Sequence, residues 1–494
     1  MSGAPPPAPG TLTRRVFAGG AWGLVGTLGQ AGAGVAAALV TARLLSPEDF
    51  AVAAIAGVLA DLAGRLGHVG LVESLIKERE EIETLAQSAF VALAGLGALL
   101  ASALVAAIPL LTRFYDEPRL AGAVLVVALS LFLGLANGVP RALLQRSLRL
   151  KEINVLQTAQ RFVAAAFAIA LALSGAGFWA LVLPGTLAQL LATPVLFRLA
   201  RFRPRLRFAW ERVRRTLPFG AGVFGSRLLS FLGDDLDYVV LGRYLPRDVF
   251  GQYYFAFTRA RVPYAFLGAA AQDPLFAAFS EVGADRPRLV RAVSRVASVH
   301  FAIFGPLFFF LFLLADPLIP FLFGPQWSPS VPLCRAFALM NLLPAAGGFT
   351  GSVLFALGRS WLMFGLNVLR VAAVAAVLAW GVTSGRSAFE IGVALAAVTA
   401  LVLSVHLVWL FRILGAGVGD ARRMYGPTLL AAGIATAAFA ALRLLGWSPS
   451  SLPAPAYLLG AGAVLGLAYL VAARFLNRPV ADEVLPWLKE RIGR

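Results

Sequence analysis

The chain contains little of the chemistry from which soluble enzymes build catalytic sites. Its 494 residues include three histidines and a single cysteine, Cys334, and these are scattered along the sequence. Such a distribution predicts no metal site and excludes an intramolecular disulfide bond. No GxxxxGK[ST] motif occurs, so nothing in the sequence indicates direct use of ATP. We therefore expect neither a cofactor nor a metal.

Charged residues are also scarce. They make up 14% of the chain, against roughly a quarter in soluble domains, whereas hydrophobic residues make up 59%. Apolar stretches long enough to cross a bilayer as helices recur from end to end. The sequence therefore predicts an all-α polytopic membrane protein with about 14 transmembrane helices. The expected spans lie near 16–42, 50–72, 85–111, 120–140, 153–175, 177–197, 216–241, 249–275, 296–323, 332–357, 361–383, 388–411, 425–446 and 454–475.

The basic residues are distributed unevenly between the two predicted sides of the membrane. The net charge is +18, and if the N-terminus is cytoplasmic, 29 of the 43 Lys and Arg residues fall on the inside. Only 7 fall in outside loops, and 7 lie within helices. This asymmetry follows the positive-inside rule and predicts an even number of spans, with both termini cytoplasmic. Topology thus accounts for the basic charge, and we expect no nucleic-acid partner.

A short pattern occurs twice without a gap, 200 residues apart. Residues 43–51 read RLLSPEDFA and residues 243–251 read RYLPRDVFG. A second pair follows with an offset of 213, RSLRLKEINVL at 146–156 and RSWLMFGLNVL at 359–369. The pairs predict one unit duplicated as a parallel repeat, since the half before the linker would contain an even number of spans and both halves would then have the same orientation. Duplicated halves are typical of transporters, with the substrate path between the halves.

The offset of 200 predicts two six-helix lobes joined by a basic linker, RFRPRLRFAWERVRR. We expect the linker to be mostly a solvated cytoplasmic loop, in which Phe208 and Trp210 can rest on anionic headgroups. The predicted segments are a disordered N-terminal tail at 1–13, the first lobe (TM1–6) at 14–200, the linker at 201–215, the second lobe (TM7–12) at 216–412, and TM13–14 with a cytoplasmic tail at 413–494.

Charges inside predicted spans are the candidate functional residues, because they are costly in a membrane and usually face a cavity or a partner. Asp61, Arg65 and His68 share one face of the second predicted helix by their spacing. One interpretation is a neutralised Asp61–Arg65 pair that helps packing. The other is a polar stripe on a water-filled cavity, in which His68 could titrate near neutral pH.

The seventh predicted span carries Arg227 followed by Asp234, Asp235 and Asp237. Carboxylates close to one basic group repel one another, so one of them is suited to hold a proton or a sodium ion. The alternative is that Asp235 and Asp237 sit near the outer interface, where charge is less costly. Together with Asp61, these three aspartates are the predicted ion-coupling residues for H⁺ or Na⁺.

Arginine dominates the charges predicted to be buried. The planar guanidinium group suits phosphate oxygens and suits a cationic drug poorly. This composition favours an anionic substrate. The predicted substrate-binding residues are Arg65, Arg227, Arg259 and Arg261; the buried set also includes Arg161, Arg335 and Arg370.

Six stretches carry a resemblance to a known family. They are ARLLSPEDFAVAA at 42–54, VGLVESLIKERE at 69–80, LDYVVLGRYL at 236–245, FGQYYFAFTRA at 250–260, LFAAFSEV at 275–282 and PLIPFLFGPQWSPSVPLCR at 317–335. In order and spacing they are similar to the Wzx-type polysaccharide flippases of the multidrug/oligosaccharidyl-lipid/polysaccharide (MOP) exporter superfamily.

The resemblance implies two six-helix lobes in a V, a central cavity and alternating access. It implies export of an undecaprenyl-pyrophosphate-linked oligosaccharide from the cytoplasmic to the periplasmic leaflet, for lipopolysaccharide or exopolysaccharide biosynthesis. The polysaccharide polymerase and glycosyltransferases of the same pathway are the implied partners. Asp237, Arg243 and Arg259 stand where the family places polar residues, whereas Asp234 and Asp235 depart from its pattern.

Two other functions stay open at this point. A MATE-like drug/cation antiporter of the same fold would have a predominantly acidic cavity. A membrane glycan polymerase or ligase would need a long external loop with catalytic acids, and the predicted outside loops are short. We therefore expect a transporter and not an enzyme.

Overall fold

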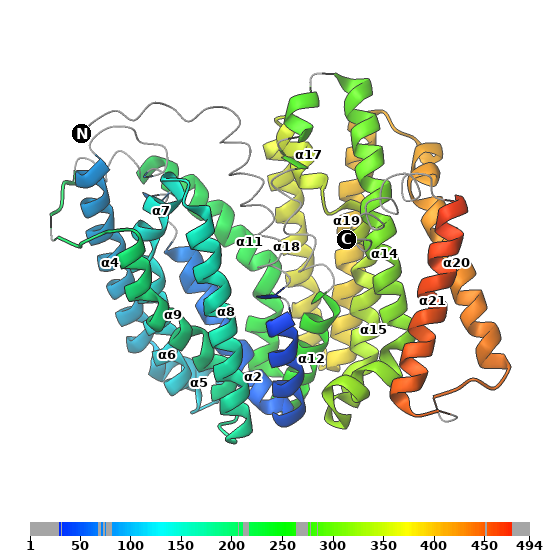
Figure 1. Ribbon diagram of the computed structural model, residues 1–494, viewed down its shortest axis with the longest axis horizontal. Coiled ribbons are helices and arrows are strands. Elements are labelled where there is room, and N and C mark those ends of the chain that lie inside the picture. Colours follow the sequence, from blue (N-terminus) through cyan, green and yellow to red (C-terminus); the bar gives the residue numbers. More distant parts are fainter. Residues whose placement is uncertain are drawn as a thin grey trace. The chain divides into compact units, whose positions relative to one another are not determined.

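The computed structural model describes residues 29–30, 32–67, 71–72, 75, 82–205, 207–210, 217–262, 275–276, 278–283, 285–449 and 452–476, with side chains from 228 onward in the helix that begins at 217. All regular elements in these ranges are helical (Figure 1). The chain divides into two compact units, Met1–Arg243 and Tyr244–Arg494. The first unit therefore includes the helix of the predicted seventh span, beyond the predicted lobe boundary at the linker.

The first unit is organised around one central helix, α6. It packs against α2, α4 and α9, and α8 packs on α9. Leu131 and Leu135 of α6 are buried in a core with Leu85 and Leu93 of α4. The elements are a helix at Gly32–Leu44, then α2 (Pro47–Leu66), α4 (Ile82–Ala106), α5 (Ile108–Tyr115), α6 (Leu120–Ala136), α7 (Gly138–Arg146), α8 (Leu150–Leu173), α9 (Trp179–Leu199) and α11 (Leu217–Tyr244).

In the second unit the 38-residue helix α14 takes the central place. It packs against α15, α16, α20 and α21, and α19 packs on α15 and α18. Trp327 is fully buried and stacks on Phe255 with ring centroids 3.9 Å apart. The elements are α12 (Arg247–Ala260), α14 (Arg286–Phe323), η1 (Pro325–Ser330), α15 (Val331–Met340), α16 (Leu342–Gly347), α17 (Thr350–Ala356), α18 (Ser360–Thr383), α19 (Ala388–Leu414), α20 (Val418–Leu444) and α21 (Ala454–Leu476).

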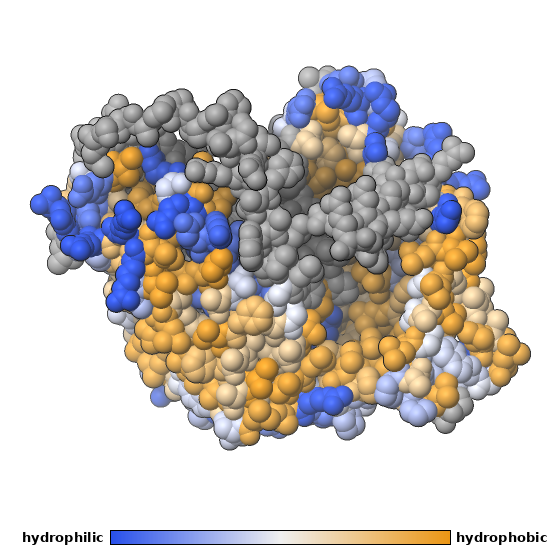
Figure 2. All heavy atoms as spheres, in the orientation of Figure 1, coloured by the Kyte–Doolittle hydropathy of each residue, from blue (hydrophilic) through white to orange (hydrophobic). Residues whose placement is uncertain are grey.

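Ten helical segments among the described residues are long and apolar enough to cross a membrane. Apolar side chains cover the middle of the visible helices, and hydrophilic ones gather at their ends (Figure 2). Ten predicted spans are thereby confirmed as such segments. The other four, predicted near 16–42, 50–72, 216–241 and 249–275, lie partly outside the described residues, so 14 stays a prediction. The ten segments are Ile82–Ala106, Leu120–Arg146, Leu150–Leu173, Trp179–Leu199, Arg286–Phe323, Pro325–Ala356, Ser360–Thr383, Ala388–Leu414, Val418–Leu444 and Ala454–Leu476.

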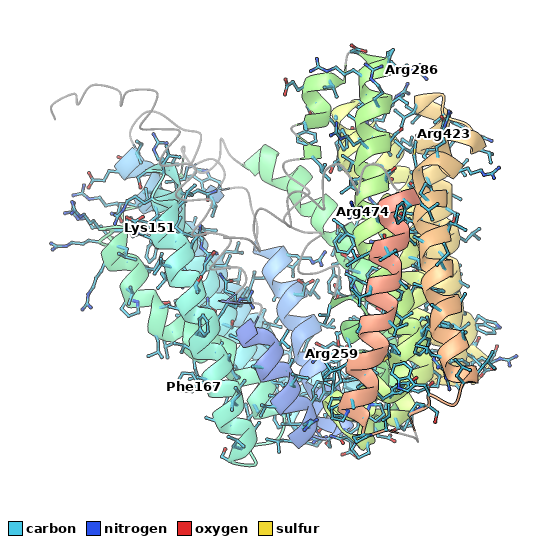
Figure 3. All side chains as sticks on the ribbon, turned by 45° about the vertical axis from the view of Figure 1, so that its right-hand side comes forward. Lys151, Phe167, Arg259, Arg286, Arg423 and Arg474 are labelled. Atoms are coloured by element: carbon cyan, nitrogen blue, oxygen red, sulfur yellow. The ribbon has the colours of Figure 1, made fainter. Side chains whose placement is uncertain are left out.

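Basic residues gather at one end of the second unit. Arg286 at the start of α14 and Arg423 near the start of α20 lie at this end (Figure 3). Arg286 donates a hydrogen bond to the main-chain carbonyl of Ile413, at the end of α19. The sequence assigns both arginines to the inside, and the structure places them together within this unit.

The two copies of the 43–51 pattern form the same local structure. In each, a helix ends, two residues follow, and the next helix begins: Leu45 and Ser46 before α2, and Leu245 and Pro246 before α12. The phenylalanine of each copy is buried in its own unit. The pattern therefore builds a tight helix–helix turn, which agrees with duplication of one unit.

The second repeat pair has a different register from the one that letter matching suggests. α8 and α18 are both 24 residues long and begin 210 residues apart, not 213. Before them, Leu148 and Gly358 both have positive φ, at 54° and 69°. The offset of 213 is therefore wrong. Of its matched letters, Asn, Val and Leu come from helix positions three residues apart, which lie on the same face.

The first part of the basic linker is attached to α4. Gln87 donates from Nε2 to the carbonyl of Arg203 over 3.0 Å and accepts from the main-chain N–H of Arg205 over 2.7 Å. Ser88 accepts from the N–H of Ala209 over 3.0 Å. The arginine side chains of this segment are exposed, as a solvated loop predicts, but its backbone is fixed to the first unit by buried side chains.

Candidate functional site

An arginine surrounded by aspartates lies between α2 and α11 in the first unit. Arg65 Nε is 2.6 Å from Asp61 Oδ2, one helical turn earlier on α2. Its Nη2 atom is 3.4 Å from Asp235 Oδ2 and 3.7 Å from Asp234 Oδ2, both on α11. One guanidinium group thus contacts three carboxylates.

The formal charge of this cluster is negative. Three carboxylates face one guanidinium group, and its side chain is only 21% exposed. The ring of Phe231 lies under the guanidinium carbon of Arg65, at 5.7 Å from the centroid. Asp237 is buried on the same helix, 6% exposed, and has polar contacts of its own. Partial burial strengthens both the attraction to Arg65 and the repulsion among the carboxylates.

The structure brings together most of the predicted ion-coupling residues. Asp61, Asp234 and Asp235 meet at Arg65, so the ion pair predicted on α2 is present, whereas the polar stripe with His68 stays a prediction. Among the described residues, no group of three His, Cys, Asp or Glu side chains is placed to hold a metal ion. The cluster is an ion-pair network, and its carboxylates converge on Arg65. His68 and the side chain of Arg227 lie outside the described residues.

Arg65 is one of the predicted substrate ligands, and that role stays a prediction. Its guanidinium group contacts three carboxylates, so it lies among the predicted ion-coupling residues. Arg335 is occupied in a similar way in the second unit, since it pairs with Asp316 and donates to the carbonyl of Phe312 over 3.2 Å. The sequence spacing revealed Asp61–Arg65 but could not show which side chains α11 adds.

Arg259 on α12 has a contrasting environment. Its guanidinium carbon lies 5.5 Å from the ring centroid of Phe255 and 5.6 Å from that of Phe323. Its Nε atom is buried and has no hydrogen-bond partner, and within the described part of the chain no carboxylate lies within ion-pair distance of it. Aromatic faces compensate the charge in part. Arg261 is exposed, with its guanidinium carbon 5.3 Å from the Phe257 ring centroid.

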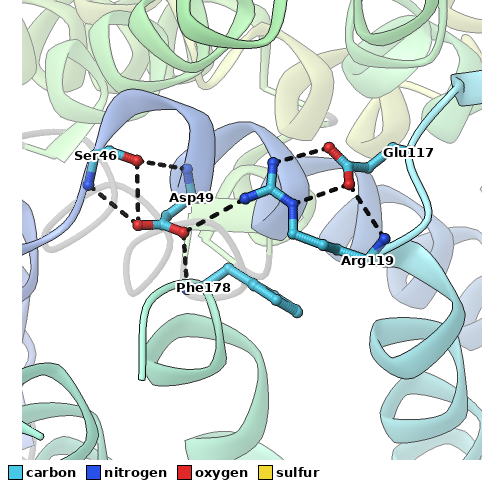
Figure 4. Close-up of polar contacts among 5 residues, drawn as sticks. All are labelled: Ser46, Asp49, Glu117, Arg119 and Phe178. Atoms are coloured by element: carbon cyan, nitrogen blue, oxygen red, sulfur yellow. Dashed lines mark hydrogen bonds and ion pairs between the residues drawn. The ribbon is translucent and has the colours of Figure 1, made fainter. Parts of the chain in front are cut away.

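A polar clasp holds one end of the first unit (Figure 4). Asp49 accepts from the N–H of Ser46 over 3.2 Å, and Ser46 Oγ accepts from the N–H of Asp49, which forms the capping box of α2. Asp49 also accepts from the N–H of Phe178, just before α9, over 3.1 Å. Arg119, just before α6, lies 3.9 Å from Asp49. We define these contacts, with that of Arg119 to Glu117, as the clasp.

Arg119 of the clasp also binds a second carboxylate. Its Nε and Nη2 atoms are each 2.9 Å from the oxygens of Glu117, and this hydrogen bonding raises the pKa of Arg119 above its ordinary value. The clasp joins the ends of α2, α6 and α9. We did not predict it, although Ser-x-x-Asp at 46–49 is a recognisable capping signal. In the second copy Pro246 caps α12 without a side-chain hydrogen bond.

Comparison with known proteins identifies the family. A family model described as polysaccharide biosynthesis protein matches residues 40–332, more than half of the chain. The chain belongs to this family. Two relatives match most of its length. The succinoglycan biosynthesis transport protein ExoT of Rhizobium meliloti (strain 1021) is 28% identical over 377 residues, covering 76% of this chain and 75% of that protein. The lipopolysaccharide biosynthesis protein WzxC of Escherichia coli (strain K12) is 27% identical over 403 residues, covering 80% and 81%.

Two solved structures share the fold of this chain. The lipid II flippase MurJ, in an inward closed conformation, matches with a TM-score of 0.74 at 13% identity, over 93% of this chain and 99% of that one. An inward-facing MATE family multidrug resistance transporter of the MOP superfamily matches with a TM-score of 0.59 at 16% identity, over 78% and 94%. At these identities the likeness concerns the fold alone.

Proposed function

We propose that the protein is a flippase that moves an undecaprenyl-pyrophosphate-linked oligosaccharide from the cytoplasmic to the periplasmic leaflet of the inner membrane, with both termini in the cytoplasm. Membership of the family, relatives that are named biosynthesis and transport proteins, and ten candidate membrane spans support this function. The pathway would be lipopolysaccharide or exopolysaccharide biosynthesis, with its glycosyltransferases and polymerase as partners.

Arg259 is the observation that favours an anionic substrate. A charged side chain within a membrane protein is costly, and this one has no carboxylate to offset the cost among the described residues. A buried arginine without a carboxylate partner is suited to bind a pyrophosphate group, because the phosphate oxygens can accept paired hydrogen bonds from the planar guanidinium group. Arg227 on α11 and Arg261 at the end of α12 would contribute further positive charge. Arg65, which is already paired, would not.

The cluster at Arg65 would couple transport to a cation. In the structure Arg65 is the cation that Asp61, Asp234 and Asp235 share. A proton or sodium ion that binds these carboxylates would compete with Arg65 and loosen α2 from α11. The cation would then bind more tightly when Arg65 is separated from the carboxylates than when it is paired with them. A difference in affinity between two conformations is what couples ion binding to an alternating-access cycle.

Translocation of fluorescent lipid-linked oligosaccharide in proteoliposomes tests this function. We expect leaflet exchange without any new covalent bond, accelerated by a proton or a sodium gradient imposed separately. Replacement of Arg227, Arg259 and Arg261 together by alanine should abolish exchange, whereas Arg335→Gln, which removes an arginine paired with a carboxylate, should not. Normal exchange by the triple variant would refute the assignment of these arginines, and a new glycosidic bond would indicate a polymerase or ligase.

A drug/cation antiporter is the second candidate. The negative formal charge of the Arg65 cluster would suit a cationic substrate, and the fold is shared with a MATE transporter. This function predicts uptake of a cationic dye such as ethidium into proteoliposomes in exchange for protons or sodium. Dye exchange without movement of the lipid-linked oligosaccharide would favour the antiporter over the flippase.

A further inference from the structure

A cavity of about 710 Å³ lies within the first unit, and the sequence offers no sign of it. This volume falls in the range of about 300–1,000 Å³ that is typical of sites for small ligands. Most of its described lining comes from α2, α6, α7, α8 and α9, and Leu93 of α4 also lines it. Small residues keep it open: a Cβ atom placed on Gly64 or on Gly185 would meet nothing within 4 Å.

One wall of the cavity is polar and basic. Gln157, Gln160 and Arg161 of α8 line it, and their spacing places them on one helix face. Figure 3 shows α8 between Lys151 and Phe167, and the three residues lie between these two in the sequence. Arg141 of α7 adds a second guanidinium group. No Asp or Glu occurs among the described residues that line the cavity.

These polar groups have unused hydrogen-bonding capacity. Among the described residues, Arg141 and Arg161 form no ion pair, in contrast to Arg65. Asn137 also lines the cavity and donates from Nδ2 to Thr193 over 2.9 Å, but its Oδ1 atom is buried without a hydrogen-bond partner. A buried acceptor without a donor costs free energy, so a ligand that donates a hydrogen bond would be favoured there.

We propose that this cavity binds an acidic sugar of the transported glycan. The amides of Gln157, Gln160 and Asn137 both donate and accept, which matches sugar hydroxyl groups. Arg141 and Arg161 match a carboxylate, which guanidinium groups bind through paired hydrogen bonds. The proposal rests on the proposed flippase function and adds to it a subsite, within the first unit, that selects among glycans.

The anion could instead be the pyrophosphate of the lipid carrier, so the test separates the two sources. Full-length protein in nanodiscs is titrated with a glucuronate-containing tetrasaccharide, with the same tetrasaccharide after reduction of its carboxyl groups, and with inorganic pyrophosphate. Isothermal titration calorimetry measures each affinity. We expect the acidic tetrasaccharide to bind and the reduced form to bind about tenfold more weakly or worse, because charge-assisted hydrogen bonds are lost.

Three variants test whether the acidic tetrasaccharide binds in this cavity. Arg141→Gln with Arg161→Gln should weaken the acidic tetrasaccharide about tenfold or more, and Gly185→Leu should block binding by filling open space in the cavity. Arg198→Gln removes an exposed arginine of α9 that does not line the cavity and should bind as the wild type does. Thermal unfolding of each variant confirms that it is folded.

Unchanged affinity in the folded double variant and in Gly185→Leu would refute the subsite. Binding of pyrophosphate with no binding of the acidic tetrasaccharide would refute the sugar and assign the cavity to phosphate. Failure of the flippase function is distinguishable from both outcomes, because it would leave lipid-linked oligosaccharide untransported while the binding of the soluble tetrasaccharide persisted.

Discussion

Replacing Arg65 by glutamine should expose three carboxylates to one another without a counter-charge. Arg65 lies 2.6, 3.4 and 3.7 Å from Asp61, Asp235 and Asp234. Removing one partner of a fully buried ion pair costs about 3–5 kcal/mol, because it leaves the other charge buried and unpaired. The four side chains are 19–44% exposed, so solvent screens part of this repulsion. We therefore expect a loss of about 2 kcal/mol in the free energy of unfolding.

A double-mutant cycle turns this expectation into a test of the cluster. Adding Asp235→Asn to Arg65→Gln removes one unpaired carboxylate, so the double variant should recover about 1 kcal/mol relative to the single Arg65 variant. Asp235→Asn alone should be nearly neutral, because it removes one of three charges that compete for one arginine. Equilibrium unfolding of the purified protein in detergent, with tryptophan fluorescence as the signal, measures all three free energies.

Arg335→Gln serves as the matched control for this cycle. Arg335 contacts a single carboxylate, and its side chain is 38% exposed, so its loss should cost no more than about 1 kcal/mol. Equal stabilities of the Arg65→Gln and Arg335→Gln variants, with no recovery on adding Asp235→Asn, would refute the view that the three aspartates share Arg65 as their main counter-charge.

Three further substitutions probe local structure in the first unit. Asp49→Ala should lower the free energy of unfolding by about 2 kcal/mol, as thermal unfolding would show, because Asp49 would no longer accept hydrogen bonds from the N–H groups of Ser46 and Phe178. Gly177→Ala should cost more than Gly175→Ala: both have positive φ, but only at Gly177 would the Cβ atom approach Asp49, at 3.1 Å. Equal costs would mean that the close approach has no effect. Gln87→Leu should accelerate tryptic cleavage in the linker without affecting cleavage elsewhere, because it removes two hydrogen bonds to the linker backbone; an unchanged cleavage rate would contradict that attachment.

Features that depend on neighbouring residues could be predicted from the sequence. Ten spans follow from local hydropathy, since a segment long and apolar enough to cross a bilayer needs no partner to be recognised. The turn before α2 and its counterpart before α12 follow from a repeated local pattern. The pairing of Asp61 with Arg65 follows from the spacing of one helical turn. In each case the residues that interact are within a few positions of one another.

Features that join distant residues were decided by tertiary structure alone. Asp235 meets Arg65 across 170 positions, and Gln87 holds the linker across more than a hundred. The offset of 210 between the repeats was found only from the matching turns before α8 and α18. Sequence matching failed there because residues three or four positions apart lie on the same helix face, so similar residues can match in the wrong register. The cavity beside Arg161 has no sequence signal, since an empty volume depends on how several helices pack and not on any one of them. The sequence by itself therefore determined what crosses the membrane, and packing decided which polar residues meet there.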